Sequence, residues 1–317
     1  MPGSATTGSK AGFCAGNYTS SQVPAPSGTA SASSTYSMSR YAESSRWFAV
    51  LACCFGIACG PCFGSDVGEI VERATAALNA DWAADPLYAY LEKDEVQKGD
   101  KLTSKTFEVV MIDGSEYHLP RAVDDQPLSP DRQHAELIKF KNEVRHRKSE
   151  SPSARRARIE AWKKQRDENG ELLLDFPSVL NFRLLGEETK NGYAAWVLDA
   201  TPKPGIVPTT RAGKVLAGVR GKAWVEKDTL HPMKVECTVV TPVPVFGPLA
   251  SVLPGTQIEI GMTRVTDSVW LIEEVSIRLN VSKLRMFKSS EMTRSTYTQF
   301  RLNASAMEEL LSKAGQE

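Results

Sequence analysis

Val275-Ser276-Ile277-Arg278-Leu279-Asn280-Val281-Ser282 is the stretch that decides the fold, because apolar and polar residues alternate along it. A period of two is typical of a β-strand with one buried face and one face in water. Similar runs occur at about 181–188, 193–200, 218–226, 233–239, 257–262 and 292–300. About seven consecutive strands with short connections predict an antiparallel meander.

A hairpin and two helices complete the expected architecture. The run 106–111 indicates a strand, and Asp113-Gly114 suits a tight turn into a second strand at 116–119. Apolar residues at spacings of three and four predict an opening helix at about 66–82, and a closing helix is expected at 304–311. We therefore predict an α+β fold, a curved antiparallel β-sheet that forms an incomplete barrel closed by helices.

A charged segment interrupts this pattern. Residues 131–169 contain 12 Lys or Arg and 7 Asp or Glu. Ser129-Pro130 and Ser151-Pro152 each place a capping hydroxyl before a proline at the first helical position. We expect an inserted charged helical arm at about 129–169, with two exposed helices at about 130–149 and 152–168 that reach out from the sheet.

The partner of this arm is open between two interpretations. Its net positive charge would attract an anionic membrane surface through residues 131–169, whereas a solvated insertion needs no partner. The second interpretation is favoured because acidic residues are interleaved. Only Phe140 and Trp162 could stack on bases, so we expect no nucleic-acid partner.

The N-terminal part looks like an export segment. Residues 1–45 are rich in Ser, Ala, Thr and Gly, and we expect them to be disordered or to precede the true start, for which Met38 is a candidate. The apolar run from Trp47 to Cys59 is about 13 residues long, as in a signal sequence rather than a permanent span. We predict a signal sequence or N-terminal anchor at 46–65, and hence an exported, periplasmic or outer-membrane-associated protein. Lipidation at Cys59 stays open.

The sequence offers no convincing catalytic centre. Cys59-Gly60-Pro61-Cys62 matches a redox C-x-x-C, but it follows the export-like run instead of a βαβ strand. The histidines lack metal-ligand spacing, and no P-loop or nucleophile elbow occurs. We therefore predict a protein that is not an enzyme and that has no catalytic residues, no metal and no cofactor.

The segment 239–254 is almost wholly apolar and contains four prolines, which exclude a central strand. It is expected either to line a ligand cavity or to fill a corner of the core. The candidate ligand-binding residues lie in and around this segment, and each is also an ordinary core candidate. They are Trp224, Val245, Phe246, Leu249, Val252, Leu253, Trp270 and Met286.

Six motifs stand out between about 180 and 302. They are Phe182–Thr189, Ala200–Gly205, Gly221–Val225, Leu253–Thr256, Thr263–Trp270 and Tyr297–Phe300. With these motifs, the region resembles poorly characterised secreted proteins of acidobacterial type, which in turn resemble the outer-membrane lipoprotein-sorting (LolA/LolB-like) group. The resemblance implies a β-rich domain at 66–317 whose apolar concavity holds acyl chains.

Two functions follow as hypotheses. The first is a non-enzymatic envelope protein that binds lipid or acylated protein in an apolar half-barrel cavity, in a process such as outer-membrane lipoprotein sorting. The alternative is an interaction module whose basic helical arm docks a protein partner or a membrane surface, with the sheet as scaffold. An empty apolar cavity would favour the first hypothesis, and a filled one the second.

Overall fold

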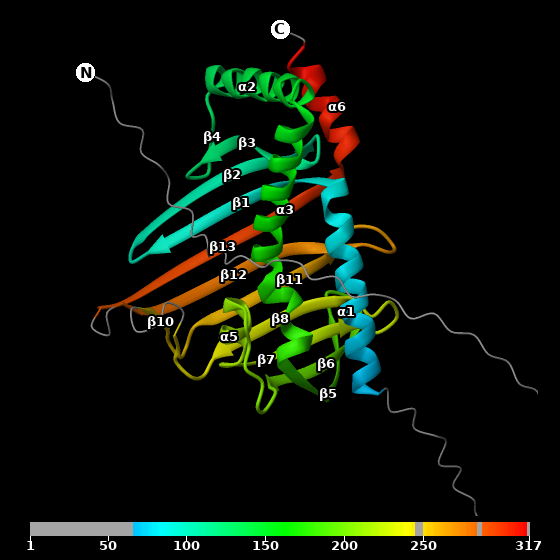
Figure 1. Ribbon diagram of the computed structural model, residues 1–317, viewed down its shortest axis with the longest axis vertical. Helices are drawn as coiled ribbons and strands as arrows, with labels where there is room; N and C mark the ends of the chain where they lie inside the picture. Colours follow the sequence, from blue (N-terminus) through cyan, green and yellow to red (C-terminus); the bar gives the residue numbers. More distant parts are fainter. Residues whose placement is uncertain (1–65, 245–249, 284–286, 316–317) are drawn as a thin grey trace, which may run out of the picture. The chain divides into compact units, whose positions relative to one another are not determined.

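The computed structural model describes residues 66–244, 250–283 and 287–315 (Figure 1). They belong to one compact unit, Ser65–Glu317, which contains its own hydrophobic cores. The expectations for 1–45 and 46–65 concern residues outside the described part of the chain.

Thirteen described strands form one antiparallel sheet in the order β4-β3-β2-β1-β13-β12-β11-β8-β7-β6-β5, with the short β9 and β10 beside β12. The strands are β1 (Tyr88–Lys98), β2 (Lys101–Ile112), β3 (Ser115–Val123), β4 (Gln126–Pro127), β5 (Leu180–Lys190), β6 (Tyr193–Pro202), β7 (Val219–Glu226), β8 (Pro232–Val239), β9 (Val243–Pro244), β10 (Ala250–Val252), β11 (Gln257–Arg264), β12 (Trp270–Lys283) and β13 (Phe287–Leu302). The predicted meander is therefore confirmed from β5 to β13. Because β4 and β5 are not paired with each other, the sheet is curved but not closed, as predicted.

The two halves of the chain meet where β13 pairs with β1, from Tyr88 opposite Leu302 to Gln97 opposite Met292. The hairpin β2–β3 turns at Asp113 and Gly114, whose φ angles are +46° and +91°. Both residues thus take the left-handed conformation that this two-residue turn requires. The local turn chemistry fixes the hairpin, whereas a long-range pairing joins it to the meander.

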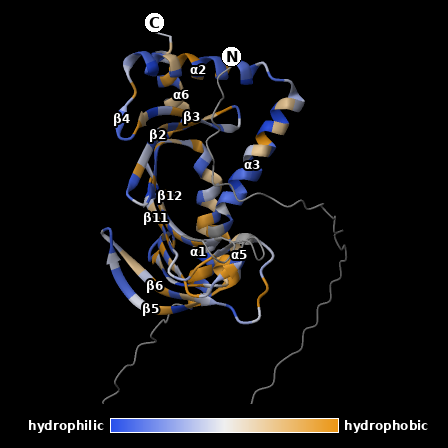
Figure 2. Cartoon of the chain, turned by 90° about the vertical axis from the view of Figure 1, so that its left-hand side faces the viewer, coloured by the Kyte–Doolittle hydropathy of each residue, from blue (hydrophilic) through white to orange (hydrophobic). Residues whose placement is uncertain are grey.

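Helices cover parts of both faces of the sheet. They are α1 (Val67–Ala84), the 3₁₀ turn η1 (Asp85–Leu87), α2 (Pro130–Lys148), α3 (Pro152–Leu174), α4 (Phe176–Val179), α5 (Arg211–Leu216) and α6 (Asn303–Lys313). The sheet curves around α1 and α3, and we call the face towards these helices the concave face (Figures 1 and 2). The opposite face is called convex.

Three hydrophobic clusters fix the helices. On the concave face, α1 contributes Ile70 and Ala74 to one cluster, and α3, α4 and α5 contribute to the largest one, which contains Leu173 and Leu216. On the convex face, α2 and α6 pack on β1–β3 through a separate cluster that includes Phe140.

The expectation that the charged arm reaches out from the sheet is wrong. Helix α2 packs on the sheet, since Phe140 is fully buried and Val144 is 4% exposed. Helix α3 turns back and crosses the concave face, and it ends at Leu174 rather than 168. Phe140 and Val144 are spaced by one helical turn, so a narrow apolar stripe suffices to dock a helix that is otherwise polar.

The apolar segment 239–254 forms a small hairpin at the edge of the described sheet. Strand β9 pairs with β10, and β10 pairs with β12, where Val252 lies opposite Val281. Residues 245–249 and 284–286 lie outside the described residues. Pro244 thus lies in a short peripheral strand, in agreement with the exclusion of a central strand.

Candidate ligand-binding face

Helix α3 is held against the sheet at both of its ends. At the first end, Ile159 lies so close to the turn that a Cβ on Gly114 would come within 2.9 Å of its Cδ1. Nearby, the Arg158 guanidinium donates to Ser115 Oγ at 2.7 Å and to Glu150 Oε2 at 2.8 Å. These contacts join the start of α3 to the β2–β3 hairpin.

The second end of α3 is held by α1. Arg166 lies 3.9 Å from the ring centroid of Trp82 and 3.3 Å from the Asp85 carboxylate. Gly170 leaves room for the same indole, because a Cβ there would approach Trp82 to 2.6 Å. Since contacts hold both of its ends, α3 has a fixed position across the concave face.

Beside α3, strand β12 presents a row of apolar side chains on the concave face. Val275, Ile277 and Leu279 lie at the rim of the largest core cluster and remain partly exposed. Val281 continues the row and is also partly exposed. These are the alternate residues of the stretch on which the sequence-based fold prediction rests, and they lie where helix coverage is incomplete.

The next strands change the chemistry of the concave face from apolar to polar. On β13, Ser295 lies opposite Val275 and Thr293 lies opposite Ile277. Beyond them, Tyr297 lies opposite Glu92 of β1. The concave face is therefore amphipathic, with its boundary between β12 and β13.

Aromatic rings cluster on the polar side. The ring centroids of Tyr90 and Tyr297 are 5.6 Å apart in an edge-to-face arrangement, and Phe300 lies 5.9 Å from Tyr90. Burial, followed by the charges of nearby carboxylates, raises the pKa values of both tyrosines well above their usual range. Both hydroxyls are protonated at neutral pH and can act as hydrogen-bond donors.

His118 carries a positive charge beside these rings. Its Nδ1 lies 3.1 Å from Glu92 Oε2, and its Nε2 lies 3.5 Å from Glu116 Oε2. Burial alone would lower the pKa of His118, but the two carboxylates raise it to about 9. Glu116 lies two residues before His118 on β3 and is visible in the sequence, whereas Glu92 belongs to β1 and meets the ring only in the folded sheet.

A second buried network joins α1 to the β7–β8 turn. Asp81 is 2% exposed, and its Oδ1 accepts the backbone N–H of Trp270 at 3.0 Å. His231 stacks on the Trp270 ring with centroids 5.9 Å apart, and its Nδ1 lies 2.9 Å from Thr229 Oγ1. His231 is buried, and its Nε2 lies 3.6 Å from Asp81 Oδ1 on α1.

Asp81 should make stability depend on pH. Burial raises the pKa of Asp81 from 3.8 to about 6, against the opposing effect of the Trp270 N–H bond. The folded state therefore keeps a proton that the unfolded state loses, and this contribution is present below about pH 4 and lost as pH rises through about 6. This rise in the pKa of Asp81 corresponds to a loss of about 3 kcal/mol in the free energy of unfolding between low and high pH.

We expect Asp81→Asn to remove most of this dependence while keeping the acceptor for Trp270. Urea unfolding at pH 4 and pH 7.5 would measure this effect. At the higher pH, the free energy of unfolding of the variant should rise by about 2–3 kcal/mol relative to wild type. Asp267→Asn, at a fully exposed position, is the control. Parallel pH profiles for wild type and Asp81→Asn would refute the assignment.

The predicted ligand-binding residues fall into two groups. Trp224, Val252 and Trp270 are buried in the largest core cluster, and Leu253 is half-buried. Trp224 Nε1 also donates to Glu188 Oε2 at 2.9 Å, and the Lys190 ammonium lies 4.7 Å from the centroid of its ring. Val245, Phe246, Leu249 and Met286 lie outside the described residues. Ligand contact by any of the eight stays a prediction.

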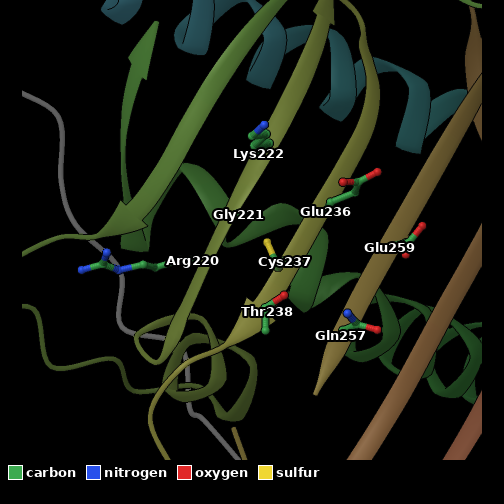
Figure 3. Close-up of a pocket in the computed structure, with 8 residues that line it drawn as sticks. All are labelled: Arg220, Gly221, Lys222, Glu236, Cys237, Thr238, Gln257 and Glu259. Carbon is green, nitrogen blue, oxygen red and sulfur yellow. The ribbon is translucent and has the colours of Figure 1, made fainter. Parts of the chain in front are cut away.

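A polar depression of about 230 Å³ lies on the convex face (Figure 3). Strands β7, β8 and β11 line it, with Arg220 and Lys222 on one side and Glu236 and Glu259 on the other. Lys234 Nζ lies 2.5 Å from Glu236 and 3.3 Å from Glu259, so both carboxylates are neutralised locally. With its polar lining, this depression does not provide the apolar cavity that the first hypothesis requires.

Among the described residues, no group of three or more His, Cys, Asp or Glu side chains is arranged to hold a metal ion. Within the same residues, no helix combines the length and apolar character needed to cross a membrane. Cys237 is 3% exposed, and burial raises the pKa of its thiol to about 12, as expected for a small buried hydrophobe.

Comparisons with known proteins give distant structural similarities. No family model matches the sequence, and no curated protein matches it. A DUF1329 family protein from Desulfovibrio piger is 14% identical over 74% of this chain and 92% of its own, with a TM-score of 0.33. An outer-membrane lipoprotein-sorting protein domain from Vibrio parahaemolyticus is 12% identical over 73% and 93% of the two chains, with a TM-score of 0.31. A LolA superfamily protein from Nitrosomonas europaea is 11% identical over 74% and 92%, with a TM-score of 0.29.

Proposed function

We propose that this chain is a non-enzymatic binding protein that holds the acyl chain of a lipid or an acylated protein along the concave face of β12. The observation that supports this proposal is the partly exposed row Val275, Ile277, Leu279 and Val281. Apolar side chains at the rim of a core stay exposed at a cost of about 25 cal/mol per Å², which a bound apolar group would recover.

The shape of the row suits an elongated ligand. From Val275 to Val281 the strand advances by six residues, or about 20 Å at about 3.3 Å per residue. All four side chains point to one face because they alternate along the strand. An extended acyl chain can therefore contact the whole row beside α3.

The polar side of the concave face suits the other end of an amphiphile. Tyr90 and Tyr297 offer hydroxyl donors, and the His118 imidazolium lies between two carboxylates. An ester or amide group next to the acyl chain would find the two hydroxyl donors there. The proposal therefore favours an amphiphilic ligand over a pure hydrocarbon.

The export-like pattern at 46–65 supports an envelope location, periplasmic or outer-membrane-associated. Under this proposal, outer-membrane lipoprotein sorting is one process that requires such a carrier. The sequence motifs that resemble the lipoprotein-sorting group support this setting.

Two neighbouring residues on β12 provide a matched test. Ile277 faces the concave side and Ser276 faces the convex side, so Ile277→Asp places a charge in the proposed site and Ser276→Asp does not. We expect Ile277→Asp to weaken binding of a fluorescent fatty acid at least about tenfold, the equivalent of 1.4 kcal/mol, and Ser276→Asp to leave it unchanged.

A second variant separates loss of binding from loss of fold. Ile277→Trp keeps the position apolar and fills the space above it, so it should weaken probe binding while circular dichroism stays that of the wild type. Equal probe affinity for wild type, Ile277→Asp and Ile277→Trp, or no binding by the wild type, would contradict the proposal.

A further inference from the structure

The acidic residues in the connection between α2 and α3 form ion pairs with arginines of the same segment. Between Lys141 and Arg156 the only carboxylates are Glu143 and Glu150. Glu143 Oε1 accepts from Arg147 Nε at 2.6 Å, and Glu150 Oε2 accepts from Arg158 Nη2 at 2.8 Å. Each acidic residue is thus paired with an inward-facing arginine.

Those two arginines donate hydrogen bonds to the β2–β3 hairpin. Arg147 is 7% exposed, and its Nη1 donates to the carbonyls of Ile112 at 3.0 Å and Ser115 at 2.8 Å. Arg158 donates to Ser115 Oγ on the same hairpin. Because Glu143 and Glu150 pair with these inward-facing arginines, they form no ion pair with the Lys and Arg side chains on the outer surface.

The outer surface of this connection carries a regular basic stripe. Lys141, Arg145 and Lys148 are exposed on α2 at positions i, i+4 and i+7, which share one side of a helix. Arg155 and Arg156 are exposed in the first turns of α3. Of these five cations, Arg155, which is 53% exposed, has a described ion-pair partner within 4.0 Å: Asp113, at 3.7 Å.

Two exposed apolar side chains lie within the same surface. Ile138 is 45% exposed and precedes Lys141 by three residues on α2. Lys141 Nζ donates to the Ala314 carbonyl at 3.0 Å, which places the end of α6 beside it. Leu311, 36% exposed, lies one turn before Ala314.

We infer that this surface, which we call the basic corner, docks the protein onto an anionic phospholipid bilayer. It comprises Ile138, Lys141, Arg145, Lys148, Arg155, Arg156 and Leu311. Cations attract anionic headgroups, while isolated large apolar side chains among them enter the interface. Much of α2 is coloured as hydrophilic in Figure 2.

The corner fits a bilayer better than a nucleic acid. A nucleic-acid surface commonly adds aromatic side chains for stacking, but Phe140 is fully buried under α2, and Trp162 lies on the inner side of α3 with Arg166 5.8 Å from its ring centroid. The docking goes beyond the proposed acyl-binding function, because the corner is a separate surface and requires no ligand on β12.

Vesicle flotation of the compact unit 65–317 tests the inference, with phosphatidylcholine vesicles that either contain or lack phosphatidylglycerol. We expect binding only to the anionic vesicles. Arg145→Glu combined with Lys148→Glu should weaken binding to the anionic vesicles about 30-fold or more, because each basic residue near the surface contributes about fivefold to the affinity. Ile138→Ser should weaken binding without changing its salt dependence.

The control makes the same charge change elsewhere. Arg220→Glu combined with Lys222→Glu reverses two exposed cations on the convex face and should leave vesicle binding within about twofold of the wild type, since both lie outside the corner. An equal loss in this control would overturn the inference. So would equal binding to neutral vesicles, or tighter binding of a DNA duplex through the same corner residues.

Discussion

Phe140→Ala should lower the free energy of unfolding by about 3–5 kcal/mol, as expected when a fully buried aromatic side chain is removed. Phe140 lies in a highly charged segment, yet it is the largest side chain that α2 contributes to the core on the convex face. Its ring centroid lies 5.8 Å from that of Tyr117 on β3. Urea unfolding monitored by circular dichroism would measure the loss.

Ile138→Ala, two residues earlier, is the matched control because Ile138 is 45% exposed. It should change the free energy of unfolding by about 0.5 kcal/mol or less. If both variants lost the same small amount, α2 would be a solvated arm, as the sequence pattern suggested, and its packing on β3 would be refuted.

Gly221→Ala should lower the free energy of unfolding by about 3 kcal/mol or more, which is at the upper end of the effects of overpacking. A Cβ at this position would lie 2.0 Å from the backbone oxygen of Glu236 and 2.7 Å from Cys237 Sγ. The oxygen cannot retreat without disturbing the pairing of β7 with β8, in which Gly221 lies opposite Cys237. Thermal and urea unfolding would both show the effect.

Gly261→Ala on the neighbouring strand β11 is the control for this substitution. A Cβ there would first meet the Glu273 side chain at 3.4 Å, which can move. We expect a change of about 1 kcal/mol or less. A Gly221→Ala protein as stable as Gly261→Ala would show that β7 and β8 do not approach as closely as described.

The meander could be predicted because its strands keep their polarity on one face. Met233, Val235, Cys237 and Val239 are buried in β8, so their alternation with polar residues is visible in the sequence. Strand β1 could not be recognised over its full length, because its concave side carries Tyr90, Glu92 and Asp94 instead of aliphatic residues. Its pairing with β13 joins residues some 200 positions apart, for which a single sequence has no signal.

The docking of the charged segment was missed for a different reason. Composition describes a helix by its average residue, whereas packing depends on a narrow stripe. On α2 that stripe consists of Phe140, Val144 and the aliphatic part of Arg147. The acidic residues that favoured a solvated insertion instead neutralise Arg147 and Arg158, which face inward.

The candidate site was predictable only in part. The apolar row on β12 lies in the very stretch that decided the fold, yet alternation alone does not reveal that helices leave the row partly exposed. His118 and His231 were assigned no role because each also has a partner that is distant in sequence: Glu92 of β1 lies beside His118, and Asp81 of α1 lies beside His231. Such groupings depend on tertiary contacts that no local pattern specifies.

Photo-crosslinking with a diazirine fatty acid tests the central claim most directly, because mass spectrometry of the peptides locates the bound chain. The account predicts adducts on the concave side of β12, at Val275, Ile277, Leu279 or Val281, that an unlabelled fatty acid competes away. Adducts confined to the convex face, or no competed adduct on the described part of β12, would contradict it.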